Sequence, residues 1–296
     1  MKRLFYRATW IMVAIAITAG WACTSRGVAA DPADPFADFT RAWRDDPAWH
    51  DGKAECCVYD ATREIYGQLR QYRARLYTDQ ELTDPDTKTK SATGHGRAAF
   101  KHHLREDIAT ENYDYHYSTM CYVGVSDLKS LKLDMGSQED CGATFKQYIN
   151  HAGRFSYHQF SYFPKEGHRT GQSSPPENLA FQDALSVLLR GYPFEQAPQL
   201  TLMLLPDQTS NKLSAVEPVP YQIRYVGWET LDLPIGAVEA HHLEVSPVSG
   251  GNDPAMHYWF AADGTAPMLH VMVQYEGPGG ISYRLRSLER RAYWKR

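Results

Sequence analysis

The sequence predicts a mainly β protein, built as one curved antiparallel sheet or half-barrel of about twelve strands. Three observations predict this class. Apolar and polar residues alternate along most of the chain, as around Tyr72, Ala74 and Leu76. Turn residues separate the alternating runs, and helical spacing is confined to two short segments. Strands that adjoin one another without helices between them argue against a βαβ architecture.

The first 30 residues have the three-part layout of an export signal. Lys2, Arg3 and Arg7 form a basic start, a largely apolar run covers residues 8–22, and small residues follow at 27–30. The apolar run is shorter than the roughly 20 residues of a comfortable membrane span. We therefore expect cleavage after Ala30, release into the periplasm or the medium, and no transmembrane segment in the mature chain.

Cys23 offers a second interpretation of the same segment, in which the cysteine becomes the lipidated first residue of a lipoprotein. Such a cysteine usually follows an aliphatic residue at the third position before it and a small residue next. Gly20 and Trp21 depart from that pattern. Cleavage after Ala30 is therefore the preferred interpretation.

Composition limits the kinds of partner. The 296-residue chain has a formal net charge of −4. Removing residues 1–30 takes away four basic residues and no acidic one, so the net charge becomes −8. A mildly acidic protein is a poor electrostatic match for nucleic acid or anionic headgroups. The length suits one large β domain or two smaller ones.

Four cysteines remain in the mature chain: Cys56, Cys57, Cys121 and Cys141. An even number in an exported protein predicts two disulfides. A bond between the neighbours Cys56 and Cys57 would be strained, so each is expected to pair with Cys121 or Cys141. A metal thiolate site or a redox pair is the alternative, but no Cys-x-x-Cys spacing supports it.

The chain divides into three expected parts after the signal. Phe36, Phe39 and Trp43 lie at helical spacing within residues 31–51 and predict a short N-terminal helix. Residues 52–296 form the antiparallel β domain, with polar loops at 79–97 and 164–178. A helix is predicted over residues 178–190, ending at Gly191 with Pro193 just beyond it.

This helix separates two sets of strands. After it we expect strands over residues 200–205, 221–225, 228–233, 238–245, 256–261, 269–275 and 281–286. The chain then forms either two β subdomains, at 52–175 and 195–296, or one sheet that curls around the helix. A curved sheet needs its concave face filled, by an apolar helix or by an apolar ligand.

Two regions resemble known groups of proteins. The runs Tyr113-Asp114-Tyr115-His116-Tyr117 and Ser137-Gln138-Glu139-Asp140-Cys141-Gly142, together with Asp51-Gly52-Lys53-Ala54-Glu55, resemble exported bacterial proteins of unknown function with a Gln-Glu-aromatic-Cys-Gly stretch. Asp140 stands here in place of the aromatic residue. The hairpins of residues 228–293 are similar to those of periplasmic proteins related to lipoprotein carriers. This resemblance implies a periplasmic half-barrel with an apolar cavity and implies no reaction.

The leading hypothesis is a periplasmic binding or carrier protein that shields a lipid, an acyl chain or another apolar small molecule from water. Tyr115, Tyr117, Trp228 and Trp259 are the candidate lining residues. Tyr113, Tyr115 and Tyr117 share one strand face, and packing of that face on the core is the preferred explanation over an aromatic wall of a ligand cleft. Burial of apolar ligand surface would contribute roughly 25 cal/mol per Å².

The second hypothesis is an exported hydrolase or metalloenzyme centred on Glu139 and Asp140, with His116 or His158 nearby. It requires these groups to share a cleft and Cys141 to be unpaired. No metal-binding histidine spacing, nucleophile elbow, phosphate-binding loop or dinucleotide fingerprint is present, so no cofactor is predicted. A structural partner in envelope assembly is the third hypothesis.

Overall fold

The computed structural model describes residues 34–249, 254–264 and 268–295. Within these ranges the predicted β class is confirmed, and fifteen strands replace the expected twelve or so. The strands are β1 (Ala54–Ile65), β2 (Gln68–Thr83), β3 (Arg97–Ile108), β4 (Tyr115–Gly124), β5 (Ser130–Glu139), β6 (Gly142–His151), β7 (Arg154–Ser161), β8 (Gly167–Ser173), β9 (Leu179–Phe181), β10 (Leu200–Leu205), β11 (Val219–Leu233), β12 (Gly236–Pro247), β13 (Met256–Ala261), β14 (Met272–Gly277) and β15 (Ile281–Arg291).

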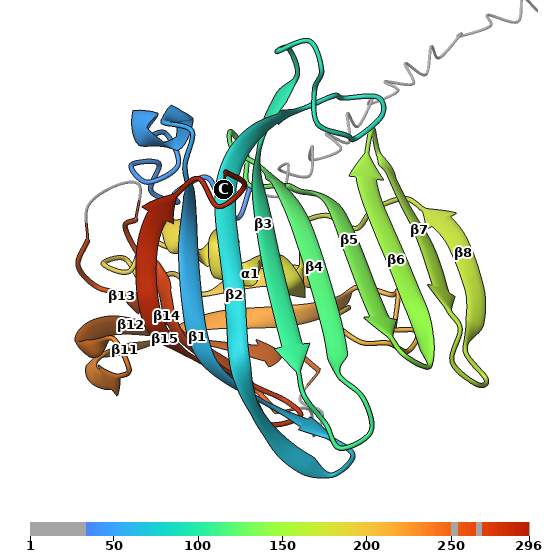
Figure 1. Cartoon of the computed structure of the whole chain (residues 1–296). Helices are drawn as coiled ribbons and strands as arrows, with labels where there is room; N and C mark the ends of the chain where they lie inside the picture. Colours follow the sequence, from blue (N-terminus) through green and yellow to red (C-terminus); the bar gives the residue numbers. More distant parts are fainter. Residues whose placement is uncertain (1–33, 250–253, 265–267, 296) are drawn as a thin grey trace, which may run out of the picture. The chain divides into compact units, whose positions relative to one another are not determined.

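All fifteen strands of the described residues belong to one sheet, in the order β8-β7-β6-β5-β4-β3-β2-β1-β15-β14-β13-β12-β11-β10-β9. Each pair of neighbours is antiparallel except β9 and β10. β1 lies in the middle and joins the two halves, because it pairs with β2 on one side and with β15 on the other. The single curled sheet, and not a pair of separate sheets, is therefore the arrangement observed (Figure 1).

The hairpins follow from local turn chemistry. Tyr66 and Gly67 connect β1 to β2 with φ angles of 55° and 71°, and Ala152 and Gly153 connect β6 to β7 with 50° and 71°. Two consecutive residues with positive φ form the type I′ turn, whose twist matches that of antiparallel strands. Glycine takes the second position in both turns at no steric cost.

The strand count exceeds the prediction because polar residues lie inside strands. β2 continues to Thr83, so the expected loop at 79–97 is shorter, and the expected loop at 164–178 contains β8. The runs at 221–225 and 228–233 form the single strand β11, with a bulge between Tyr225 and Gly227. A strand can carry polar side chains on its outward face. Such residues make the alternation of apolar and polar residues harder to recognise in the sequence.

The central helical segment is shorter than predicted. Residues 179–181 form β9, and three short helical elements follow: η2 (Gln182–Ala184), α1 (Leu185–Leu188) and η3 (Leu189–Gly191). The side chains of Leu185, Val187 and Leu188 have no exposed surface. These apolar side chains are part of the hydrophobic core. Figure 1 shows α1 behind β1–β3, within the curve of the sheet.

The predicted N-terminal helix does not form over residues 34–46, although its apolar side chains are buried as expected. The described part of that segment, residues 34–46, forms turns, and only η1 (Pro47–His50) is helical. The Asp34 carboxylate accepts a hydrogen bond from the backbone N–H of Phe36, which favours a turn there. The Asp46 carboxylate accepts one from Ala48 and so caps the start of η1 instead of extending a helix before it. Phe36, Phe39 and Trp43 are nevertheless buried against the core.

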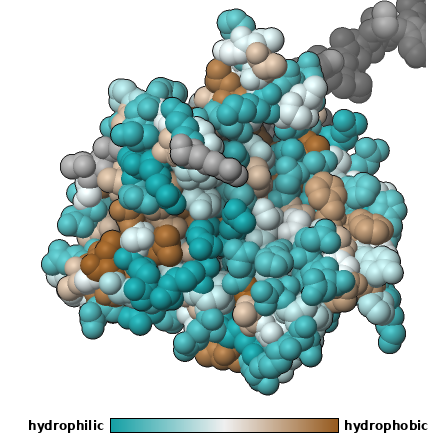
Figure 2. Space-filling view, viewed as in Figure 1, coloured by the Kyte–Doolittle hydropathy of each residue, from teal (hydrophilic) through white to brown (hydrophobic). Residues whose placement is uncertain are grey.

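The surface carries polar and apolar residues side by side on the face drawn in Figure 2. No helix of the described residues is long and apolar enough to span a membrane. The predicted cleavage after Ala30 and the alternative lipidation at Cys23 fall outside the described residues, so both stay predictions.

Candidate functional site

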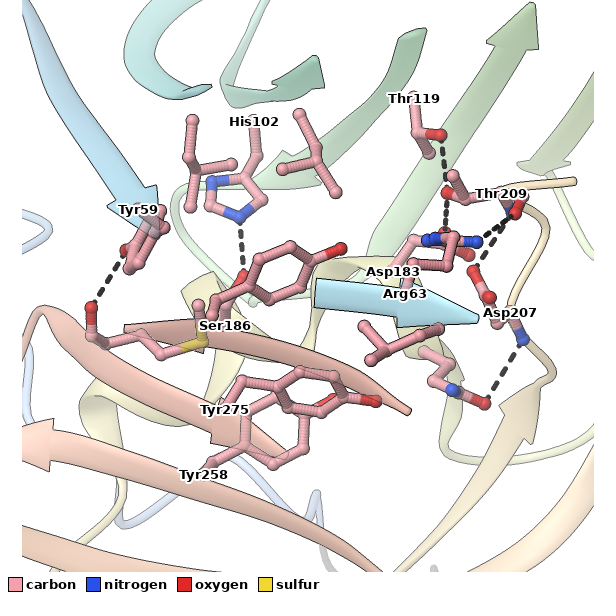
Figure 3. A pocket seen from close by; sticks show the side chains of 16 residues that line it. Tyr59, Arg63, His102, Thr119, Asp183, Ser186, Asp207, Thr209, Tyr258 and Tyr275 are labelled. Atoms are coloured by element: carbon pink, nitrogen blue, oxygen red, sulfur yellow. Dashed lines mark hydrogen bonds between the residues drawn. The ribbon is translucent and has the colours of Figure 1, made fainter. Parts of the chain in front are cut away.

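A pocket lies between the concave face of the sheet and the helical segment, and we call it the central pocket. About 620 Å³ of it is free of protein atoms, including space open to solvent. Figure 3 shows its lining. The side chains come from both halves of the sheet, from the helical segment and from residues 207 and 209: Tyr59, Arg63, Leu76, His102, Leu104, Thr119, Gln182, Asp183, Ser186, Asp207, Thr209, Tyr258, Met272, Tyr275, Ile281 and Tyr283.

The helical segment supplies three polar side chains to this pocket. Gln182, Asp183 and Ser186 all line it, although the rest of the segment is buried and, apart from Arg190, apolar. Residues three and four apart lie on the same face of a helix, so Gln182 and Asp183 share a face with Ser186. The sheet strands supply the facing residues by their two-residue alternation.

Two carboxyl groups meet at one end of the pocket. The backbone N–H of Gln208 donates to Asp183 Oδ2 at 3.1 Å, and the Thr209 hydroxyl donates to Asp183 Oδ1 at 3.0 Å. Burial raises the pKa of Asp183 well above its usual range, and the neighbouring Asp207 carboxyl raises it further. Since two carboxylates so close together repel each other, Asp183 retains its proton and shares it in a hydrogen bond with the Asp207 side chain. A ligand oxygen at this end of the pocket would compete with Asp207 for that proton.

A buried ion pair adjoins the carboxyl pair. Arg63 Nη2 donates to Glu106 Oε2 at 3.0 Å, and Arg63 Nη1 donates to the carbonyl oxygen of Thr209 at 2.9 Å. The hydroxyls of Tyr72 and Tyr283 both donate to Glu106 Oε1. Burial opposes the charged form of Arg63, but the Glu106 carboxylate prevails and holds its pKa above the usual range. Arg63 thus keeps a fixed positive charge beside the pocket.

His102 connects the sheet to the helical segment at the other end. Its Nδ1 lies 2.8 Å from Thr78 Oγ1, and its Nε2 lies 2.7 Å from Ser186 Oγ. Burial, with the positive charge of Arg190, lowers the pKa of His102 to about 3. The imidazole is therefore neutral at neutral pH and can accept a proton at one nitrogen while it donates at the other.

Tyrosine rings form an aromatic wall in the pocket. Tyr258 and Tyr275 have ring centroids 4.7 Å apart, and Tyr275 and Tyr283 stack at 5.7 Å. Tyr59 lies 5.9 Å from Tyr283 and donates its hydroxyl to the carbonyl oxygen of Met272. These rings offer an apolar surface, and the polar groups described above lie at its ends (Figure 3).

None of the four lining residues expected from the sequence contributes to this pocket. Tyr115 and Tyr117 are buried on the concave face, where Arg63 lies 5.5 Å from the centre of the Tyr117 ring. Trp228 is exposed. Trp259 stacks on His242 and donates its indole N–H to Glu229, and its strand neighbour Tyr258 takes the position that faces the pocket.

The predicted disulfides are absent, since Cys56, Cys57, Cys121 and Cys141 are all free thiols. Strand topology keeps them apart. Cys56 and Cys57 point to opposite faces of β1, and β2 and β3 separate β1 from Cys121 on β4. Three strand spacings are about 14 Å, well beyond the reach of a disulfide. Cys141 is exposed between β5 and β6.

The residues of the second hypothesis do not share one cleft. Glu139 is buried, whereas Asp140 is exposed. His116 pairs with the Asp107 carboxylate at 2.8 Å on an exposed face, and His158 packs on His168 at 4.7 Å on the hairpin of β7 and β8. The condition that Cys141 be unpaired is met, and Glu139 is shielded from bulk solvent.

No group of three or more His, Cys, Asp or Glu side chains in the described ranges could hold a metal ion. Comparisons of the chain with protein-family models, with curated proteins and with solved structures find no match.

Proposed function

We propose that the protein binds a small amphipathic molecule in the central pocket, as a carrier or receptor outside the cytoplasm. The observation that carries this proposal is the presence of ionisable side chains, Arg63 and Asp183, in a pocket within the core. Burying a charged group costs several kcal/mol, and apolar residues would pack the same space at lower cost. Perturbed ionisable groups that converge in a pocket mark a ligand site.

The lining defines the chemistry of the proposed ligand. A flat apolar part would lie on the rings of Tyr258 and Tyr275. An oxygen-rich end would meet the protonated Asp183 and the hydroxyls of Thr119 and Thr209, which lie 2.6 Å from each other. The ligand is thus amphipathic, and this refines the apolar ligand expected from the sequence.

Native mass spectrometry of the exported, purified protein tests this proposal. Wild-type protein should carry an additional mass that organic extraction releases. S186F should lose it, because the larger ring fills the pocket, and S186A should keep it. S173F, at an exposed position on β8, is the matched surface control. Wild-type protein with no bound mass, or equal binding by S186F, would refute the proposal.

A second candidate function is hydrolysis of an acyl ester, and one contact favours it. The Ser186 hydroxyl lies 2.7 Å from His102 Nε2 while Thr78 holds the other ring nitrogen. The Ser186 oxygen would attack the acyl carbon and pass its proton to His102, and the alcohol would leave as the ester bond breaks and take that proton. Water would then hydrolyse the acyl–Ser186 ester and release the carboxylic acid. The low pKa of His102, about 3, makes it a weak base, so slow turnover is expected.

A fluorophosphonate probe separates the two candidates. If Ser186 is a nucleophile, its oxygen displaces fluoride from phosphorus, and intact mass spectrometry detects the adduct. S186A would then lose the adduct while S173A retains it. A binding protein instead stays unlabelled, and S186A keeps its ligand.

A further inference from the structure

Three tyrosine hydroxyls converge at one end of the concave face, away from the residues that line the central pocket. The hydroxyl oxygens of Tyr66 and Tyr113 are 2.8 Å apart, those of Tyr66 and Tyr115 are 2.6 Å apart, and those of Tyr113 and Tyr115 are 3.4 Å apart. We call these three residues the phenol cluster. They come from the turn between β1 and β2 and from the start of β4, which lie near each other at the lower end of the sheet in Figure 1.

A buried carboxylate faces this cluster. β4 and β5 pair as far as Tyr117 opposite Ser137, and the Glu139 carboxyl, two residues further along β5, interacts electrostatically with Tyr115 and Tyr117. Glu139 is only 4% exposed, and its Oε1 has no hydrogen-bond partner. Its other oxygen accepts only a 3.3 Å hydrogen bond from Ser137. An unpaired buried carboxylate oxygen is costly to the fold, so it requires an explanation.

Cys141, in the turn between β5 and β6, lies within hydrogen-bonding reach of the Tyr113 hydroxyl. Cys141 is exposed and Tyr66 is 59% exposed, whereas Tyr115 is buried. The cluster is therefore open to solvent on one side and closed by the core on the other. A small ion has a path of entry to oxygens that the fold already holds in place.

The three oxygens lie close enough together to contact a single ion. For metal–oxygen bonds of about 2.0–2.1 Å, adjacent ligand oxygens of an octahedron lie about 2.8–3.0 Å apart. The distance between Tyr66 and Tyr113 falls in this range, and the other two, 2.6 Å and 3.4 Å, lie on either side of it. Phenolate and carboxylate are hard, anionic oxygen donors, which favour hard cations over soft ones. Three phenolates carry enough negative charge to neutralise a trivalent ion.

We propose that Tyr66, Tyr113, Tyr115 and Glu139 form a binding site for a hard trivalent metal ion, with ferric iron as the ion to test. Binding replaces the phenolic protons with three oxygen–metal bonds and releases up to three protons, with no change of oxidation state. Glu139 supplies a fourth oxygen. The remaining positions are open to water or a small anion.

The electrostatics without a metal are consistent with this site. Hydrogen bonding with Cys141, Tyr115 and Tyr66 raises the pKa of Tyr113, and burial raises the pKa of Tyr115 to about 12. Crowded acidic groups resist ionisation because their anions would repel. A bound cation reverses this preference, since it stabilises every phenolate at once. Affinity should therefore increase with pH.

Addition of ferric nitrilotriacetate to the purified full-length protein, followed by desalting, tests the proposal. The wild type should retain one equivalent of iron and develop a visible phenolate-to-iron charge-transfer band, more at alkaline than at acidic pH. Y66F, Y113F and E139Q should each reduce the retained iron by about tenfold or more. Y66F changes an exposed side chain, so its fold should be unaffected, which circular dichroism checks.

Two control variants make the result specific. Y162F alters a 71% exposed tyrosine outside the cluster and should bind iron as the wild type does. C141S removes the thiol and should also retain the band, because the proposed ligands are oxygens. The proposal is overturned if the wild type shows no band and retains no iron, or if Y66F and Y113F bind as well as Y162F does.

Discussion

At the scale of single residues, the buried charges of this protein are held by specific partners. Glu106 has no exposed side-chain surface and receives hydrogen bonds from Arg63, Tyr72 and Tyr283. These four residues come from β1, β2, β3 and β15, so one carboxylate connects the strands on both sides of the centre of the sheet. Removing one charge of such a pair leaves the other buried and uncompensated.

E106Q is therefore expected to lower the free energy of unfolding by about 3–5 kcal/mol. The double variant R63M/E106M should lose less than E106Q alone, because no unpaired charge remains. The control is E111Q, which breaks an exposed ion pair with Arg70 and should leave stability nearly unchanged. Urea unfolding measures all three, and equal losses in E106Q and E111Q would contradict the prediction.

Asp183 should give the protein a measurable pH dependence. Its pKa in the folded protein is raised above the ordinary value of 3.8 by burial and by Asp207. The folded state therefore holds a proton that the unfolded chain has released. That contribution to stability is complete below the unfolded pKa and is lost as the pH rises through the folded pKa.

D183N removes the titrating group and should flatten this dependence. From about pH 4 upward, the melting temperature of the wild type should decline relative to that of D183N. D140N, at an exposed carboxylate, should follow the wild type. Parallel pH profiles for the wild type and D183N would show that Asp183 is not protonated in the fold.

At the scale of elements, the sequence predicts strands better than it predicts sites. The strands Leu200–Leu205 and Met256–Ala261 have the predicted limits, because apolar runs with turn residues at both ends determine them locally. The pocket could not be predicted in this way. Arg63 and Asp183 are 120 residues apart in sequence and meet only through the curl of the sheet.

One local signal of the pocket was nevertheless present in the sequence. Asp183 and Ser186 lie beside the buried apolar residues Ala184, Leu185, Val187 and Leu188. Polar residues in a fully buried helix need partners, so they indicate a polar cavity or a ligand. For the cysteines, the signal in the sequence was misleading. Their even number predicted disulfides, but pairing depends on strand order, which counting cannot supply.

The N-terminal segment packs against the helical segment through Trp43. Trp43 is fully buried, stacks on Phe100 at 4.7 Å, and lies 4.7 Å from the Arg190 guanidinium. Arg190 in turn pairs with the buried Glu55 at 3.1 Å. Trp43 thus contacts η3 and β3, and the ion pair of Arg190 with Glu55 connects η3 to β1.

W43A should lower the free energy of unfolding by about 3–5 kcal/mol, as expected for the loss of a buried tryptophan. W294A removes a 49% exposed tryptophan and should have little effect. Urea unfolding followed by circular dichroism compares the two variants. A small effect of W43A would mean that residues 34–50 contribute little to the core.

At the scale of the whole molecule, the fold depends on a pairing between distant parts of the chain. β1 pairs with β2 through eleven residue pairs and with β15 through nine. The two halves of the sheet also share one hydrophobic cluster, which includes the central helix. Neither half has a core of its own, so we expect both to unfold in a single cooperative transition.

Hydrogen exchange under increasing urea tests this cooperativity. Peptides from β5–β7 and from β11–β13 should lose protection at the same urea concentration. A61P, at a buried position where β1 pairs with both β2 and β15, should lower that concentration equally for both regions, because proline removes a ladder hydrogen bond from a central strand. T170P on the edge strand β8 should act only locally, since few contacts depend on that strand. Separate transitions for the two regions, or a loss confined to one of them in A61P, would mean that the halves are independent folding units joined only through β1.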